Sequence, residues 1–95
     1  MRIIARSTLR EFWERHADAE QPLRFQDVRR AAWQGPADIK AIYANASILP
    51  NNRVVFNIKG NDYRLIAHVR YDIQIVFIRF IGTHGEYDKV NAATV

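Results

Sequence analysis

The chain has 95 residues, of which 48% are hydrophobic and 12% aromatic, so residues 1–95 are expected to form one small packed domain rather than a disordered tail. The absence of cysteine excludes a disulfide framework and a thiolate zinc site. Fourteen Lys and Arg residues against ten acids give a net charge of +4, and all bases except Lys40, Lys59 and Lys89 are arginines. Arginine suits phosphate recognition, although a GC-rich genome explains the same bias equally well.

No segment approaches the roughly 20 apolar residues that a membrane-spanning helix needs. The longest apolar run, Ile75–Ile78, is interrupted by Arg79, and the first residues lack the apolar region of a signal peptide. We therefore expect a soluble, cytoplasmic protein with no membrane partner.

The first half of the chain has the pattern of helices. A short β-branched segment over 2–5 predicts a strand, and Ser7 is a predicted N-cap for a helix that runs to His16. A second apolar pattern predicts a helix from Pro22 to Trp33, ended by Gln34-Gly35-Pro36, that pairs with the first as a hairpin. A short helical piece over 37–44 follows.

The apolar period changes to two in the second half. Residues 53–58 and 63–70 predict two strands joined by a tight turn at Gly60-Asn61-Asp62. Residues 73–81 are apolar on both sides, which predicts a strand covered on both faces. Helices followed by a meander predict an α+β fold, with the two helices packed on one face of a small antiparallel sheet.

One face of the predicted strand 63–70 is basic, because Arg64, His68 and Arg70 alternate with apolar residues. These side chains favour a groove for a polyanion backbone, although an ordinary solvated sheet face explains them as simply. Arg79 lies in an apolar strand, where a buried guanidinium requires a ligand or a structural salt bridge, and the salt bridge is the simpler explanation.

The segment 83–89 (Thr-His-Gly-Glu-Tyr-Asp-Lys) gathers groups that transfer protons or stabilise oxyanions. RNA carries its own nucleophile, the 2′-OH, so aligned acid, base and cationic groups can cleave it without a metal. The three histidines lack metal-ligand spacing, and no glycine-rich phosphate loop is present, so we expect no metal and no cofactor.

Two segments carry a family resemblance. Residues 55–66 (Val-Phe-Asn-Ile-Lys-Gly-Asn-Asp-Tyr-Arg-Leu-Ile) and 78–89 (Ile-Arg-Phe-Ile-Gly-Thr-His-Gly-Glu-Tyr-Asp-Lys) resemble the HigB family of type II toxins, within the RelE-like superfamily. The resemblance implies a RelE-like fold and a metal-independent mRNA interferase that cuts mRNA on the ribosome by 2′-OH attack. It also implies a HigA-like antitoxin with a helix-turn-helix domain, through which alone the toxin would reach operator DNA.

The resemblance also implies roles for individual residues. Arg64 matches the strand arginine that binds the scissile phosphate, and His84 stands where relatives carry a second basic residue. Tyr87 is near the position of a functional tyrosine, and Asp88 and Lys89 complete the motif. The catalytic candidates are therefore Arg64, His84, Tyr87 and Lys89. The substrate-binding candidates are Lys59, His68, Arg70, Arg79 and Asp88.

The main hypothesis is thus a ribosome-dependent endoribonuclease toxin that inhibits translation. Two alternatives remain open on the sequence. One is a non-catalytic module that blocks translation by binding RNA or the ribosome without cleavage, and the other is a protein-interaction domain with no nucleic-acid role.

Overall fold

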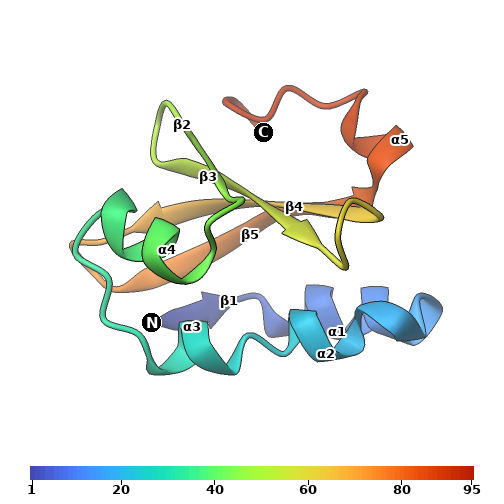
Figure 1. The fold of residues 1–95 in the computed structure, drawn as a ribbon, viewed down its shortest axis with the longest axis horizontal. Helices are drawn as coiled ribbons and strands as arrows, with labels where there is room; N and C mark the ends of the chain where they lie inside the picture. Colours follow the sequence, from blue (N-terminus) through green and yellow to red (C-terminus); the bar gives the residue numbers. More distant parts are fainter.

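The computed structural model describes residues 1–95 as a five-stranded sheet with most helices on one face (Figure 1). The sheet has the order β1-β5-β4-β3-β2, and every neighbouring pair is antiparallel except β1 and β5. The predicted α+β class is confirmed. The sheet is mixed rather than purely antiparallel, because β1 pairs with β5 in parallel. The helical half of the chain lies between these two strands and makes the crossover that a parallel pair needs. The strands are β1 (Arg2–Ile4), β2 (Ser47–Leu49), β3 (Arg53–Ile58), β4 (Tyr63–Arg70) and β5 (Ile75–Thr83).

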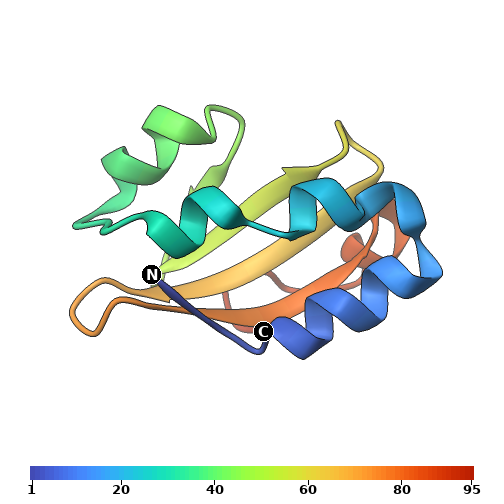
Figure 2. The same ribbon diagram turned by 90° about the horizontal axis from the view of Figure 1, so that it is seen from below.

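The helices are short, and α1 to α3 lie along one face of the sheet, as Figures 1 and 2 show from two directions. The short helix α4 stands beside the β2 edge of the sheet, and α5 follows β5 directly. None of the helices is long and apolar enough to cross a membrane. The helices are α1 (Arg6–Arg15), the 3₁₀ turn η1 (Ala17–Ala19), α2 (Glu20–Leu23), α3 (Gln26–Arg30), α4 (Pro36–Ile42) and α5 (His84–Tyr87).

The first helix forms where the apolar period predicted it, with Leu9 and Phe12 each 2% exposed. Its predicted start is wrong, because Ala5 occupies the N-cap position and no side chain caps the helix. Ser7 lies inside the first turn instead. The strand β1 ends at Ile4 and leads into the helix without a loop in which a capping residue could be placed.

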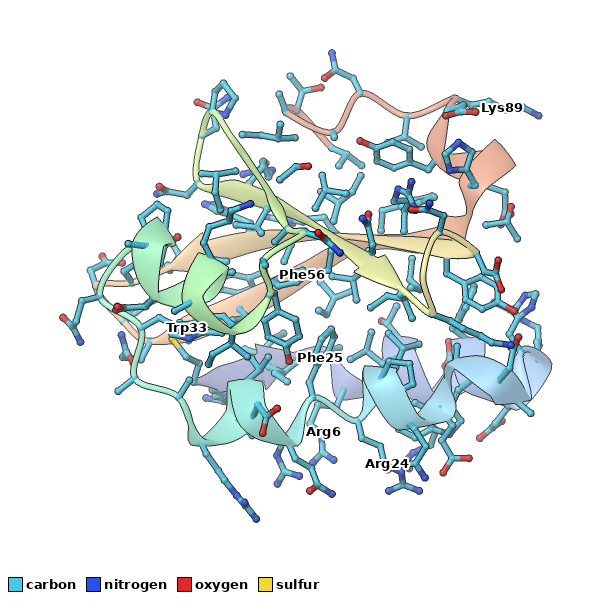
Figure 3. The ribbon with its side chains drawn as sticks, in the orientation of Figure 1. Arg6, Arg24, Phe25, Trp33, Phe56 and Lys89 are labelled. Atoms are coloured by element: carbon cyan, nitrogen blue, oxygen red, sulfur yellow. The ribbon has the colours of Figure 1, made fainter.

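The predicted second helix is wrong as one continuous element, because the chain breaks at Phe25. This residue has φ of 48°, and the left-handed conformation separates α2 from α3. A left-handed residue costs roughly 1–2 kcal/mol, which burial of an aromatic ring offsets. The Phe25 ring is 5% exposed and lies 5.7 Å from Phe56 and 6.1 Å from Tyr43 between centroids (Figure 3). Trp33, predicted as helical, lies in the irregular segment between α3 and α4 and is buried there.

The main core lies between the sheet and α1 to α3. The predicted alternation in β4 is confirmed, because Tyr63, Leu65, Ala67 and Val69 are buried while Arg64, His68 and Arg70 on the other face are half-buried. In β3 the side chains that face the helices and join this core are Val54, Phe56 and Ile58.

The second face of the sheet is also partly covered. Val55 and Ile66, at 3% and 0% exposure, are buried outside the main core cluster. Residues 90–95 run back over this face in Figure 1, and Arg53 Nε donates to Val95 O at 3.1 Å. A second hydrogen bond joins Asn51 Nδ2 to Ala93 O at 3.3 Å. This face is therefore a short secondary core flanked by basic side chains.

The prediction that β5 is covered on both faces is wrong. Only Val76 and Gly82 of this strand are buried, Arg79 is exposed, and the other residues are half-buried. β1 pairs only with residues 75–77, so the rest of this edge of β5 has no neighbouring strand. The strand also carries a β-bulge, since Ile66 opposes Phe80 while Ala67 opposes Ile78. Arg79 is the extra residue of the bulge.

A polar contact ties the helical layer to the turn between β3 and β4. Asp18 in η1 accepts a hydrogen bond from the Tyr63 hydroxyl at 2.7 Å and forms an ion pair with Lys59 Nζ at 2.9 Å. The hydrogen bond to Asp18, followed by burial, raises the pKa of Tyr63 to about 12. The same hydrogen bond, together with Lys59, lowers the pKa of Asp18. The turn is thus fixed to the helices on one side.

Ile66→Ala is expected to destabilise the protein as strongly as Leu65→Ala, by about 2–5 kcal/mol each. The two residues lie on opposite faces of β4, and both are 0% exposed. Urea denaturation of the two variants measures the comparison. An Ile66→Ala cost below about 0.5 kcal/mol would show that residues 90–95 do not cover the second face.

Asp18→Asn is expected to lower the Tyr63 pKa from about 12 toward the ordinary value of 10.0, because the carboxylate no longer disfavours the phenolate. The raised pKa stabilises the fold fully below pH 10.0, and this contribution is lost as pH rises through about 12. NMR titration of the Tyr63 ring measures the shift. An unchanged Tyr63 pKa in the variant would contradict the contact.

Candidate active site at the ends of strands β4 and β5

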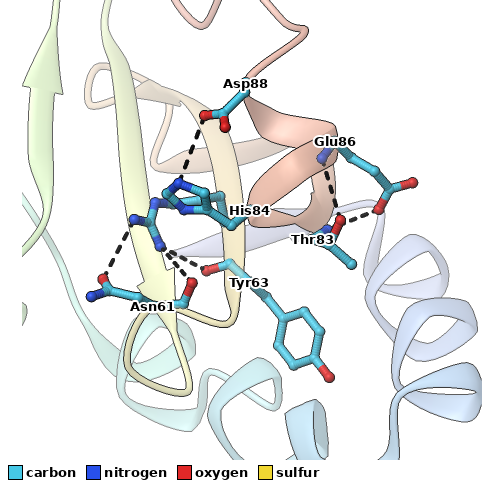
Figure 4. Close-up of polar contacts among 7 residues, drawn as sticks. Asn61, Tyr63, Thr83, His84, Glu86 and Asp88 are labelled. Carbon is cyan, nitrogen blue, oxygen red and sulfur yellow. Dashed lines mark hydrogen bonds and ion pairs between the residues drawn. The ribbon is translucent and has the colours of Figure 1, made fainter.

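The site is centred on Arg64, the second residue of β4. Arg64 lies opposite Asn57 of β3 and Gly82 of β5 on the sheet face away from α1 to α3. Its guanidinium donates to the carbonyl oxygen of Asn61 at 3.3 Å and to the side-chain oxygen of Asn61 at 3.4 Å (Figure 4). It also lies over the Tyr87 ring, with Cζ 5.9 Å from the centroid. No carboxylate pairs with it, so its charge is available to an anion.

A capping box begins α5 immediately after β5. Glu86 N–H donates to Thr83 Oγ1 at 3.3 Å, and Thr83 N–H donates to Glu86 Oε1 at 2.8 Å. These hydrogen bonds lower the pKa of Glu86, which keeps this carboxylate ionised. Glu86 is therefore a structural group that orients α5.

The start of α5 is also joined to the turn that carries Asn61. The His84 N–H donates to the carbonyl oxygen of Asp62 at 3.3 Å. The turn itself needs left-handed backbone at Lys59 and Gly60, with φ of 50° and 63°. One turn thus contacts both the guanidinium of Arg64 and the backbone of His84.

Gly82 allows α5 to lie close to the end of β5. A Cβ at this position would lie 2.7 Å from Phe80 Cζ and 3.0 Å from Glu86 Oε1. Any side chain would therefore press against the capping box. The conformation is an ordinary extended one, so space rather than backbone freedom requires glycine.

The other catalytic candidates lie on or beside α5. The exposed His84 side chain lies between Asn61 and Asp88 in Figure 4, and its Nε2 is 3.8 Å from Asp88 Oδ1. That distance makes an ion pair only when the imidazole is protonated. The half-buried ring of Tyr87 contacts Arg64, as described. Lys89 is exposed and extends outward from the end of α5 in Figure 3, so it is not gathered with Arg64.

Three substrate-binding candidates lie on the same sheet face as Arg64, further along β4 and β5. We call His68, Arg70 and Arg79 the basic band. Arg70 Nη2 forms an ion pair with Asp72 at 2.7 Å, which neutralises part of the band. Burial and the neighbouring cations Arg53, Arg79 and Arg70 lower the pKa of His68, which favours its neutral form.

Two expectations for this region need correction. Arg79 was expected to be buried with a salt-bridge partner, but it is exposed, and its guanidinium lies 5.8 Å from the Phe77 ring. The bulge turns this residue out of the strand register. Lys59 is directed to Asp18 on the helical side, so the structure does not bring it to the Arg64 face.

Sequence reasoning missed Asn61 as a partner of Arg64. The sequence places Asn61 in a tight turn, but asparagine is common in turns and gives no specific signal there. The contact forms because the Arg64 side chain extends back toward this turn. The structure contains no cluster of His, Asp or Glu that could hold a metal ion.

The arrangement can bind an anionic group at Arg64 and place imidazole and phenol groups beside it. Comparison with known proteins finds the same family that the sequence resembles. The HigB toxin family model, which describes the RelE-like toxic component of a toxin-antitoxin system, matches residues 19–90.

Curated relatives match nearly the whole chain. The mRNA interferase toxin HigB of Escherichia coli (strain K12) is 26% identical over 96 aligned residues, which cover 97% of this chain and 92% of the relative. The mRNA interferases HigB of Escherichia coli O157:H7 and Shigella flexneri match with the same identity and coverage. Because the family model spans well over half of the chain, this protein belongs to the HigB family of RelE-like toxins.

Proposed function

We propose that this chain is the toxin of a type II toxin–antitoxin system and that it cleaves mRNA on the ribosome. The single observation that carries the proposal is the unpaired guanidinium of Arg64, held by Asn61 beside α5. Family membership and the mRNA interferase names of the relatives support the same activity. Residues 1–95 then form one toxin domain.

The proposed reaction uses the nucleophile of the substrate. The 2′-oxygen forms a bond to the adjacent phosphorus while the bond from phosphorus to the 5′-oxygen breaks. A base accepts the proton of the 2′-OH, and an acid gives a proton to the departing 5′-oxygen. The products are a 2′,3′-cyclic phosphate and a 5′-hydroxyl, and no external reactant is consumed.

Arg64 would bind the non-bridging oxygens of the scissile phosphate. Negative charge accumulates on these oxygens in the pentavalent transition state, where a preorganised donor is most effective. The Asn61 contacts and the Tyr87 ring hold the guanidinium in place before substrate arrives. Preorganisation of this kind lowers the cost of reorganisation during the reaction.

His84 is the proposed proton-transfer group, because it is exposed at the start of α5 and histidine is the most common general acid or base in enzymes. Tyr87 would assist by hydrogen bonding or proton transfer from the same helix. The flexible Lys89 side chain would reach the phosphate only after moving from its outward position. Asp88 would act through its contact with His84 rather than on the phosphate directly.

The basic band would guide the flanking mRNA along the sheet. Arg79 is its most available cation, because it is exposed and has no carboxylate partner. The low net charge of +4 limits attraction to free RNA, which suits an enzyme whose substrate is presented by the ribosome. The proposed partner is a HigA-like antitoxin with a helix-turn-helix domain, which would carry the complex to operator DNA.

Arg64→Ala and His84→Ala are each expected to slow cleavage by about 10²–10³ fold, because each removes a group that stabilises the transition state or transfers a proton. Growth after induction in cells and single-turnover cleavage on programmed ribosomes measure the loss. Arg10→Ala, an exposed change on α1, is the matched control. Growth arrest by both folded site variants at the wild-type level would refute the site assignment.

Cleavage is expected to leave discrete new 5′ ends in mRNA from induced cells, because a cut at a defined phosphate creates a fixed terminus. Primer extension on RNA from cells that express the wild-type chain or Arg64→Ala detects these ends. Translation arrest without new 5′ ends would favour the alternative function, a module that blocks the ribosome by binding alone.

A further inference from the structure

The edge of β3 is only partly covered. β3 pairs with β4 along its whole length, but β2 pairs only with residues 53–55. Hydrogen-bond directions alternate along an antiparallel strand. Val69 N–H bonds to Asn52 O on the β4 side, so Asn57, five residues further on, directs its N–H and C=O to the open edge. Neither the Asn57 N–H nor the Asn57 C=O takes part in the backbone hydrogen bonds of turns, loops and caps.

Two hollows flank this open edge. The first, of about 350 Å³, lies between α2, the start of α3 and the end of β3. The second, of about 380 Å³, lies between the end of α4 and β3. The two hollows adjoin each other, because Tyr43 and Asn57 line both, and we call the two together the β3-edge groove.

The groove offers hydrogen-bonding and apolar groups that the chain itself does not use. The Tyr43 hydroxyl and the Asn57 side-chain amide have no hydrogen-bond partner within the protein. Tyr43 is packed by its ring against Phe25 and Phe56, so its position is fixed. Ile42, at the rim, is 51% exposed, the largest exposure among the large hydrophobic residues.

Cations dominate the helical side of the groove. Arg24 lines the first hollow, and Arg29 and Arg30 line an adjoining hollow that shares Gln26 with it. Arg24 is engaged by Glu20 and stacks on Trp13, but Arg29 and Arg30 form no ion pair. Asp27 is the only acid in the lining of these hollows. The groove therefore suits a chain with negative side chains.

We propose that an extended acidic segment of the antitoxin binds in the β3-edge groove and adds a short strand to β3. The inference rests on the proposed function for the existence of that partner. Backbone groups of the segment would pair with Asn57, its acidic side chains would meet Arg29 and Arg30, and an apolar side chain would cover Ile42. Strand addition is a recurring way for sheets with open edges to bind peptides.

The β3-edge groove lies close to the strand that carries Arg64, so a bound segment would lie near the candidate active site. Asn57 lies directly opposite Arg64 in the β3–β4 pairing. An added strand would lie about 4.8 Å beyond β3, and therefore about two strand spacings from the strand that carries Arg64. An RNA backbone lacks the alternating donors and acceptors that match a strand edge, which favours a polypeptide as the occupant.

The test combines amide exchange with charge reversal, using this chain and the antitoxin encoded by the adjacent gene. The Asn57 amide should exchange rapidly in the free chain and at least tenfold more slowly in the complex. Arg29→Glu with Arg30→Glu should weaken the complex at least tenfold by calorimetry. Arg6→Glu with Arg10→Glu makes the same charge change on α1, away from the groove lining, and should leave the affinity unchanged.

Co-expression separates this inference from the proposed function. The Arg29→Glu, Arg30→Glu variant should still arrest growth but should no longer be rescued by the antitoxin. Rescue at the wild-type level, or an Asn57 amide that is not protected in the complex, would overturn the inference. Loss of growth arrest by a folded double variant would overturn it too, since the arginines would then serve RNA. If the wild-type chain arrests nothing, the proposed function fails, while amide protection still decides whether a partner strand binds here.

Discussion

The pairing of β4 with β5 is the constraint on which the candidate site depends. It places Arg64 opposite Gly82, so that the strand arginine and the start of α5 meet at one end of the sheet. Gly82 leaves the space that α5 occupies, and the capping box of Thr83 and Glu86 sets the direction of the helix. The Tyr87 ring then lies over the guanidinium, and His84 begins the same short helix, without any long loop.

The turn between β3 and β4 connects this site to the rest of the fold. Its Asn61 contacts Arg64, and the carbonyl of its Asp62 accepts the His84 N–H. On the other side, Lys59 and Tyr63 are bound to Asp18 in the helical layer. The helical layer thus holds the turn that contacts the candidate site. A small domain without disulfides needs such polar ties in addition to its packed core.

Much of this arrangement was predictable from local pattern. Alternation in residues 63–70 predicted which side chains of β4 face the helices, and the family resemblance is the source of the proposal that Arg64 is a site residue. The break at Phe25 was not predictable, because its left-handed backbone is stabilised by distant aromatic contacts rather than by a local signal. The bulge at Arg79 was missed for a similar reason, since an apolar run looks the same with or without an extra residue. The roles of Lys59 and Asn61 depend on tertiary neighbours, which a single sequence does not reveal.

The central claim is that the substrate 2′-OH, aligned by Arg64 and the groups of α5, is the nucleophile. The most direct measurement uses ribosome-bound mRNA with a single 2′-deoxy nucleotide on the 5′ side of the cleaved phosphate. The account predicts that this chain cuts the all-ribose mRNA, leaving a 2′,3′-cyclic phosphate, and leaves the substituted mRNA intact at that position. Cleavage of the 2′-deoxy substrate at the unmodified rate would contradict the account.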